Sequence, residues 1–191
     1  MGMDVYGIAP QVVGKQPQRP ENWESLTEYE KDMYYNDLSI WESNNPGVYF
    51  RASCWSWRPI HAMCDFAINI AKLPFKTDYW GSNDGKGLTS QEECNTLADG
   101  IELYLMLNNA NMHDMDDTMY LCLGAWTTSG GRFMPKELED ELNEAYPTGT
   151  ILYRGVVTKD GTLAYPAHSC PLYHINNFIT FLRKCGGFEI W

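Results

Sequence analysis

The chain of 191 residues is 44 % hydrophobic and 14 % aromatic, so it is long and apolar enough to fold around a packed core. Its formal net charge of −11 argues against direct binding to nucleic acid, which needs a basic surface. The same charge suits a protein that occupies the nucleic-acid-binding surface of another protein, although an acidic exterior also serves solubility alone.

The sequence gives no sign of export or of a membrane span. The first residues lack the basic region and apolar run of a signal peptide, and no stretch approaches the roughly 18 apolar residues of a membrane helix. Six cysteines without a CxxC pair are expected to be free thiols. We therefore expect a cytoplasmic protein without membrane contact.

The N-terminal part is predicted to contain a strand, a loop and a helix. Residues 3–8 are a short candidate strand, and residues 9–22 form a loop rich in proline and glutamine. A helix is expected over residues 23–41, because Ser25 and Glu28 have the spacing of a capping box.

Residues 49–88 are the densest in side chains that bind ligands. The aromatic run at 48–57 is predicted to be extended, and Pro59 suits the first position of a following helix. On a strand, alternate residues share a face, which would group Arg51, Ser53, Trp55 and Trp57. These residues, together with Arg58 at the end of the strand, could form a binding pocket. The arginines would bind an anion, and the tryptophans would stack on a planar group. The alternative is that the tryptophans pack in the core and the arginines cover them.

A glycine-rich loop, 81–87, follows this helix. Its glycines allow backbone N–H groups to form an anion nest beside Asn83 and Asp84, although the spacing is not that of a P-loop. A surface turn whose Asn and Asp bond to their own backbone is the alternative. A helix over 91–108, with a capping box at Ser90, is predicted next.

The second half alternates between strands and helices. Residues 119–123 are predicted to be a strand or a helical turn, and 135–146 an acidic helix. An Asp-Gly pair indicates a hairpin over 150–165, which precedes a helix over 171–184 and a final strand over 188–191.

Two clusters contain the residue types of metal ligands. One could bind a divalent ion within a polar loop, and it consists of His113, Asp114, Asp116 and Asp117. The other would bind zinc through His168, Cys170 and His174, with Cys122 or Cys185 as a distant fourth ligand. The alternatives are a solvated loop for the first cluster and buried thiols with a capping histidine for the second.

These elements predict one α+β domain over residues 1–191. We expect a small, mostly antiparallel sheet with helices packed on one side, because strands and helices do not alternate strictly. The two terminal strands are expected to lie close together.

Four segments of the chain resemble a family of small phage, prophage and bacterial proteins to which no activity is attached. They are MGMDVYG at the start, GVYFRASCWSWRPI, NDGKGL and the terminal FLRKCGGFEIW. They cover about a quarter of the chain, in the family's order. Two departures stand out: residues 11–45 have the character of an insertion, and the cysteine-rich middle segment of some relatives is reduced to Cys122 and a TSGGR run.

The leading hypothesis is a non-catalytic acidic binding protein, of phage origin, that inhibits a host nucleic-acid-binding or defence protein. The resemblance, the acidity and the lack of a GxSxG, HExxH or Walker motif favour it. A cluster of side chains at strand ends and loops is the predicted binding site, and it consists of Asp4, Tyr6, Arg51, Trp55, Trp57, Arg58, Asn83 and Asp84.

Two alternatives come from other classes. The first is a binder or sponge of a nucleotide-like anion that uses the same arginines and tryptophans without a cofactor. The second is a small enzyme in which Cys54 or Cys64 pairs with His61, or in which Asp4, His61 and Asp84 act as acid–base groups.

Overall fold

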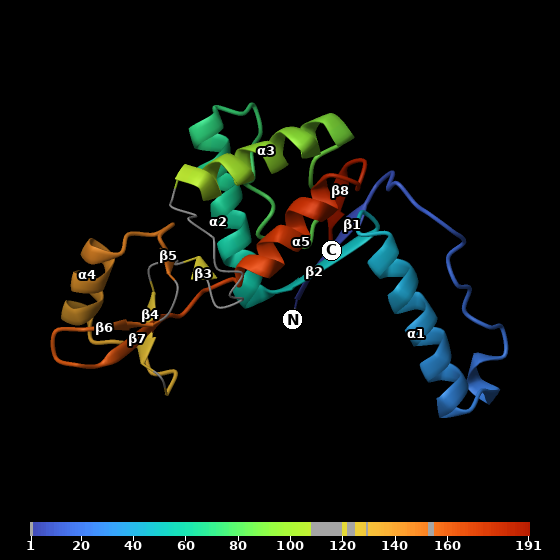
Figure 1. Cartoon of the computed structure of the whole chain (residues 1–191), viewed down its shortest axis with the longest axis horizontal. Helices are drawn as coiled ribbons and strands as arrows, with labels where there is room; N and C mark the ends of the chain where they lie inside the picture. Colours follow the sequence, from blue (N-terminus) through green and yellow to red (C-terminus); the bar gives the residue numbers. More distant parts are fainter. Residues whose placement is uncertain (1, 108–119, 122–124, 129, 153–154) are drawn as a thin grey trace.

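The computed structural model describes residues 2–107, 120–121, 125–128, 130–152 and 155–191. Figure 1 shows a central body from which a helical arm reaches out on one side and a small β-rich unit on the other. The described residues form five α-helices and two three-stranded antiparallel sheets, together with a two-stranded pair. The predicted α+β class is confirmed.

The body is built on a sheet that joins the two ends of the chain. Strand β1 (Gly2–Gly7) lies between β2 (Tyr49–Ser53) and β8 (Phe188–Ile190), antiparallel to both. The expectation that the terminal strands lie together is therefore confirmed. Because successive side chains alternate between faces, Met3 and Val5 point into the core while Asp4 and Tyr6 lie on the outer face.

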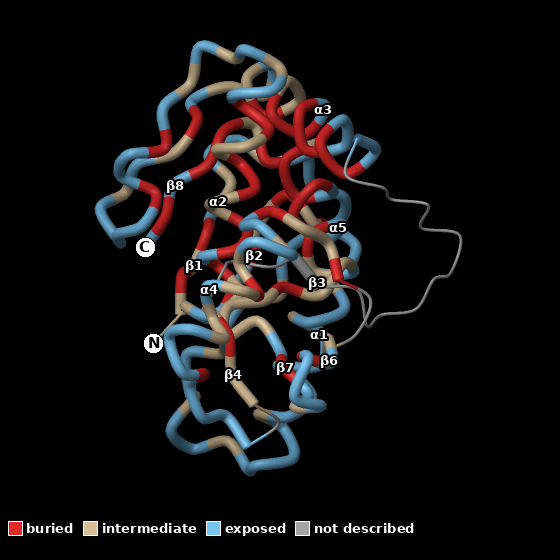
Figure 2. Tube along the Cα trace, turned by 90° about the vertical axis from the view of Figure 1, so that its left-hand side faces the viewer, coloured by how far each residue is buried: buried red, intermediate tan, exposed pale blue. Residues whose placement is uncertain are grey.

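Two helices, α2 (Cys54–Ala71) and α5 (Leu172–Leu182), lie on the inner face of this sheet, and α3 (Gln91–Leu107) packs against both of them. Figure 2 shows that the buried residues concentrate in this part of the molecule. The ring of Phe178 on α5 lies 5.1 Å from Phe50 of the sheet and 5.8 Å from Trp57 of α2. Such interlocked aromatic contacts make this the main hydrophobic core.

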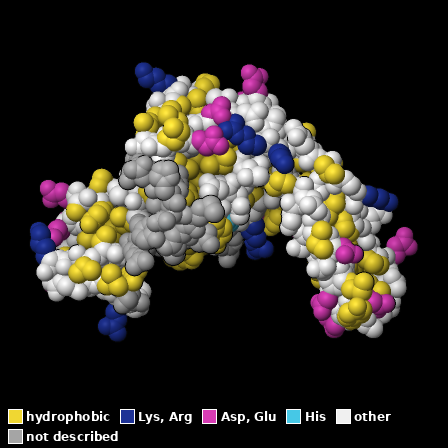
Figure 3. Space-filling view, in the orientation of Figure 1, with side chains coloured by type: hydrophobic (Ala, Val, Ile, Leu, Met, Phe, Trp, Pro, Cys, Tyr) yellow, Lys and Arg dark blue, Asp and Glu magenta, His cyan; other side chains and the backbone are white. Residues whose placement is uncertain are grey.

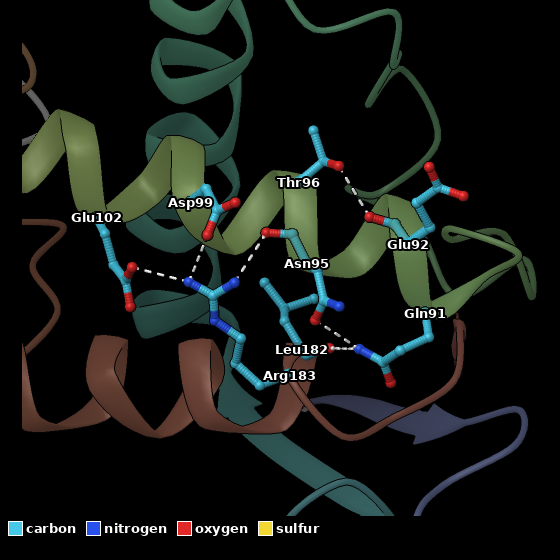
Figure 4. A network of polar contacts seen from close by, with 8 residues as sticks. All are labelled: Gln91, Glu92, Asn95, Thr96, Asp99, Glu102, Leu182 and Arg183. Atoms are coloured by element: carbon cyan, nitrogen blue, oxygen red, sulfur yellow. Dashed lines mark hydrogen bonds and ion pairs between the residues drawn. The ribbon is translucent and has the colours of Figure 1, made fainter.

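Polar contacts fix α3 against the end of α5 (Figure 4). The guanidinium of Arg183 lies 2.6 Å from Asp99 and 2.8 Å from Glu102, and it also donates to the Asn95 carbonyl. Gln91 donates to the Leu182 carbonyl at 2.8 Å. The predicted helices over 91–108 and 171–184 therefore form and are joined by specific contacts at one edge.

The arm, residues 11–44, carries the 3-10 turn Trp23–Ser25 and helix α1 (Glu28–Asn44). The prediction of one helix capped by Ser25 and Glu28 was wrong. The capping box is formed two residues later, where Thr27 accepts from the Glu30 amide and the Glu30 carboxylate accepts from the Thr27 amide. The overlapping SLTEYE sequence offers both boxes, and the second one forms.

The start of α2 also differs from the prediction. We expected residues 48–57 to be extended and Pro59 to begin the helix, but α2 begins at Cys54. Ser53 caps it by accepting from the Ser56 amide at 3.1 Å, and Pro59 lies inside the helix. Two residues that share a face on a strand lie about 200° apart on a helix. Trp55 is therefore 56 % exposed while Trp57 is only 2 % exposed.

The β-rich unit has a separate, smaller core. Strand β7 (Leu163–Pro166) lies between β4 (Trp126–Thr128) and β6 (Val156–Val157), and α4 (Lys136–Ala145) accompanies them. The predicted hairpin is the β6–β7 pair, whereas β5 (Ile151–Leu152) pairs instead with β3 (Tyr120–Leu121). The small core comprises Trp126, Met134, Leu142, Leu152 and Ala164.

No helix in the described part of the chain combines the length and the apolar character needed to cross a bilayer.

Candidate functional site

The four segments that carry the family resemblance lie side by side in the body. Strand β1 pairs with both β2 and β8, and the loop before α3 adds to the edge of β8. Gly85 donates to the Ile190 carbonyl at 2.9 Å, and Phe188 donates to the Leu88 carbonyl at 2.7 Å. Segments up to 180 residues apart in the sequence therefore form one continuous structure around the sheet.

Glycines in these segments stand where backbones touch. A Cβ on Gly7 would overlap the carbonyl oxygen of Gly47, and a Cβ on Gly87 would overlap that of Phe188. These obstacles are backbone atoms, which cannot rotate away as side chains can. The glycines of the motifs are therefore explained by packing between the segments, without reference to a ligand.

Three of the predicted site residues lie on the outer face of the sheet. Arg51 lies 3.6 Å from the Asp4 carboxylate, which also accepts a hydrogen bond from the Tyr49 hydroxyl. The rings of Tyr6 and Tyr49 are 5.1 Å apart. Burial, followed by the hydrogen bond to Asp4, raises the pKa of Tyr49 to about 12. This group is a cross-strand network centred on the Asp4 carboxylate, which contacts both Tyr49 and Arg51.

Three others border a pocket of about 380 Å³ beside the start of α2. Arg58 and Asn83 line its walls, and Trp57 forms part of its floor. The indole N–H of Trp57 donates to the Trp80 carbonyl at 2.6 Å, so the ring is fixed in place. This pocket, which we call the α2 pocket, is where the structure brings predicted site residues together around an open space.

Trp55 and Asp84 make other contacts. The exposed ring of Trp55 stacks on His168 at 5.2 Å, and the Arg58 guanidinium lies 3.2 Å from the Nε2 of His168. Burial and the nearby Arg58 charge lower the pKa of His168. Asp84 turns back on its own loop, where it accepts from the Lys86 amide at 3.2 Å and pairs with the Lys86 ammonium. The surface-turn alternative describes Asp84 well.

The sequence prediction missed His61 as a wall of the α2 pocket. Cys54, Arg58 and His61 are spaced i, i+4 and i+7, which places them on one helix face. That spacing was visible in the sequence, but it becomes informative only when the helix is known to begin before Arg58.

The structure places the acid–base and thiol pairs considered for an enzyme in different environments. Cys64 is fully buried, and burial raises the pKa of its thiol far above the ordinary value. Cys54 lines the α2 pocket with His61, but two helical turns separate them. Asp4 and Asp84 bond to other partners, and neither lines this pocket.

In the described part of the chain, no group of three or more His, Cys, Asp or Glu side chains has the arrangement needed to hold a metal ion. His168 stacks on Trp55, His174 lies 4.8 Å from the Phe50 ring, and burial raises the pKa of Cys170 to about 12. The other metal candidate, at residues 113–117, and the distant ligand Cys122 lie outside the described residues.

The chain matches no protein-family model, and neither the comparison with curated proteins nor the comparison with solved structures finds a match.

Proposed function

We propose that the protein is a non-catalytic binding protein whose arm docks on a basic surface of another protein. The observation that carries this proposal is the exposure of the arm: none of residues 11–44 is buried, although α1 is a regular helix of 17 residues. A helix of this length usually gains its stability by packing an apolar face against a core. The exposed apolar side chains of this capped helix are therefore available to bind another protein.

The arm carries an apolar stripe at helical spacing. Tyr29, Met33 and Ile40 lie within about 40° of one another around α1, by the 100° step of a helix. Their exposed fractions are 74 %, 50 % and 53 %. Asn36 interrupts this stripe between Met33 and Ile40, so the exposed apolar side chains are separate anchors for a hydrophobic groove of another protein.

Carboxylates flank the stripe on both sides. Asp32 lies on one side of it, and Glu30 and Asp37 lie on the other. The arm as a whole contains seven acidic and three basic side chains, a net charge of −4. Figure 3 shows acidic side chains around the hydrophobic ones at the free end of the arm. A groove with an apolar floor and a basic rim is the complementary surface.

This chemistry favours a nucleic-acid-binding or defence protein over a second copy of the chain. The chain without the arm has a net charge of −7, so two copies would repel each other. A nucleic-acid-binding protein presents the required basic surface, and an arm seated there would exclude the nucleic acid. The resemblance to phage and prophage proteins supports a bacterial host component as the target, and the arm coincides with the stretch that departs from that family.

Site-specific cross-linking tests the proposal. A photo-reactive amino acid is placed at Met33 in the full-length protein, with Tyr173 as the matched control, because both side chains are 50 % exposed. In bacterial lysate, position 33 should cross-link a basic nucleic-acid-binding protein, and excess DNA or about 0.5 M salt should suppress the product. Identical products from positions 33 and 173, or products insensitive to DNA, would contradict the proposal.

A further inference from the structure

The α2 pocket lies outside the arm and has its own chemistry. One wall is a face of α2, bearing Cys54, Arg58 and His61, and the opposite wall is the loop that contains Asn83. Its volume of about 380 Å³ falls in the range of small-molecule sites, which is roughly 300–1,000 Å³. The pocket is large enough for a ligand of the size of a nucleotide.

The pocket is a non-acidic region of an acidic protein. The chain has 25 Asp and Glu residues, yet none of those in the described part of the chain lines the α2 pocket. Two other pockets each combine a glutamate with cations: Glu42 with Arg51 near Tyr49, and Glu189 with Lys76 and Lys86 near Leu88. The start of α2 adds the positive end of a helix dipole beside Cys54. The Asp65 carboxylate lies 3.9 Å from His61 Nε2 but does not line the pocket, so the charge that favours an anion comes from Arg58 and the helix start.

Arg58 is available to bind that anion. Among the described residues it forms no ion pair with a carboxylate, whereas Arg51 pairs with Asp4. The Arg58 guanidinium donates to Nε2 of His168 at 3.2 Å, since a guanidinium has no acceptor, and it lies 5.5 Å from the centre of the Trp55 ring. A guanidinium has five N–H donors, so several remain for a ligand.

The remaining polar groups of the pocket are also oriented. His61 donates from Nε2 to the Thr77 carbonyl at 3.0 Å, which leaves Nδ1 on the side of Gly81, a residue of the pocket wall. Nδ1 of a neutral imidazole accepts a hydrogen, such as that of a singly protonated phosphate. Within the described residues, the Asn83 amide makes no hydrogen bond of its own.

The floor of the pocket is apolar and rigid. Met3 and the ring of Trp57 are 8 % and 2 % exposed, and the indole is fixed by its bond to Trp80. An apolar floor beneath a cationic wall matches a ligand with an organic group at one end and an anionic group at the other.

We propose that the α2 pocket binds a phosphate monoester. Arg58 and Asn83 donate to the phosphate oxygens, and the organic group lies over Met3 and Trp57. A phosphate is favoured over a carboxylate because its larger charge gains more from the cationic wall and because its oxygens match several guanidinium donors. This site is independent of the arm, so its failure and the failure of the arm proposal are separate results.

Calorimetric titration of the full-length protein tests the site with three probes: adenosine 5′-monophosphate, inorganic phosphate and adenosine. The monophosphate should bind more tightly than inorganic phosphate, and adenosine should give no heat. Arg58→Ala should weaken monophosphate binding about tenfold, the effect of losing a charge-assisted hydrogen bond. Arg51→Ala is the matched control, because it removes an exposed arginine of the same segment that lies outside the pocket, and it should leave binding unchanged.

A second variant guards against a folding effect of Arg58→Ala, whose side chain contacts His168. Asn83 lies in an exposed loop, so Asn83→Ala should weaken binding of the monophosphate severalfold without lowering the melting temperature. Three outcomes would overturn the site: no heat with millimolar monophosphate or phosphate, adenosine binding as tightly as its monophosphate, or equal losses in Arg51→Ala and Arg58→Ala.

Discussion

The body and the arm both contain many aromatic residues, but these side chains differ in how far they are buried. In the body, Phe178 is completely buried and lies among rings from the sheet and from α2. In the arm, Trp23 packs against other residues of the arm, namely Tyr34, Tyr35 and Arg19, and no residue from 11 to 44 is buried. The difference indicates that apolar residues of the body stabilise the fold, while those of the arm are exposed for contact with another molecule.

The largest expected effect is a loss of folding in Gly47→Ala. A Cβ at Gly47 would overlap the Lys184 carbonyl, and relief requires movement of the backbone between β2 and the end of α5. We expect a loss of about 3 kcal/mol or more in the free energy of unfolding, measured by chemical denaturation.

Gly130→Ala is the control for this substitution. The nearest atom to its added Cβ would be the Thr128 hydroxyl at 3.8 Å, an ordinary contact, so stability should hardly change. Equal melting temperatures for the two variants would show that the contact between the motif segments is looser than described.

Two substitutions that remove an aromatic ring compare the body and the arm at single side chains. Phe178→Ala removes a ring from the main core and should cost about 3–5 kcal/mol of unfolding free energy. Tyr29→Ala removes a ring that is 74 % exposed in the arm and should cost less than about 0.5 kcal/mol. Comparable losses in the two variants would mean that the arm contributes to the fold as the body does.

A smaller effect concerns Tyr49 and alkaline pH. The folded-state pKa of Tyr49 is raised to about 12, whereas an unfolded tyrosine titrates near 10. Its neutral form therefore contributes stability that is complete below about pH 10 and is lost as the pH rises toward the folded-state pKa. The melting temperature of the wild type should exceed that of Tyr49→Phe at pH 9, and the difference should shrink by pH 11.5.

Tyr29→Phe, which removes a hydroxyl from the exposed arm, is the matched control for the loss of a tyrosine hydroxyl. A constant difference between the wild type and Tyr49→Phe would argue against the hydrogen bond from Tyr49 to Asp4.

Elements with regular periodicity were predictable from the sequence. The strand at residues 3–8, the helices at 91–108 and 171–184 and the final strand all form within a few residues of their expected bounds. In each of them the local pattern and the tertiary environment agree. Helix α3, for example, has both a capping box at Ser90 and a buried face, so two independent signals indicate the same element.

The start of α2 was not predictable in the same way, and the site depended on it. Pro59 indicates a helix start by itself, but Ser53 provides a cap six residues earlier and the chain uses that cap. The resulting rotation separates Trp55 from Trp57 and places Arg58 in line with His61. The sequence thus identified the right stretch, while the choice between competing caps determined which side chains face one space.

Excision of the arm separates the stability of the body from the binding of a partner in one experiment. Residues 13 and 45 are adjacent, because the Asn45 side chain bonds to the amide and the carbonyl of Val13 at 2.5 Å and 3.1 Å. A short glycine–serine linker can therefore replace residues 14–44 without straining the body. Thermal unfolding and DNA-sensitive capture of a partner are then compared with those of the full-length protein.

The excised protein should melt within about 4 °C of the full-length protein, a change of roughly 1 kcal/mol at this size. It should also lose the DNA-sensitive capture of a basic partner. An excised protein that fails to fold, or one that still captures the partner, would contradict the division of the molecule into a self-sufficient body and a binding arm.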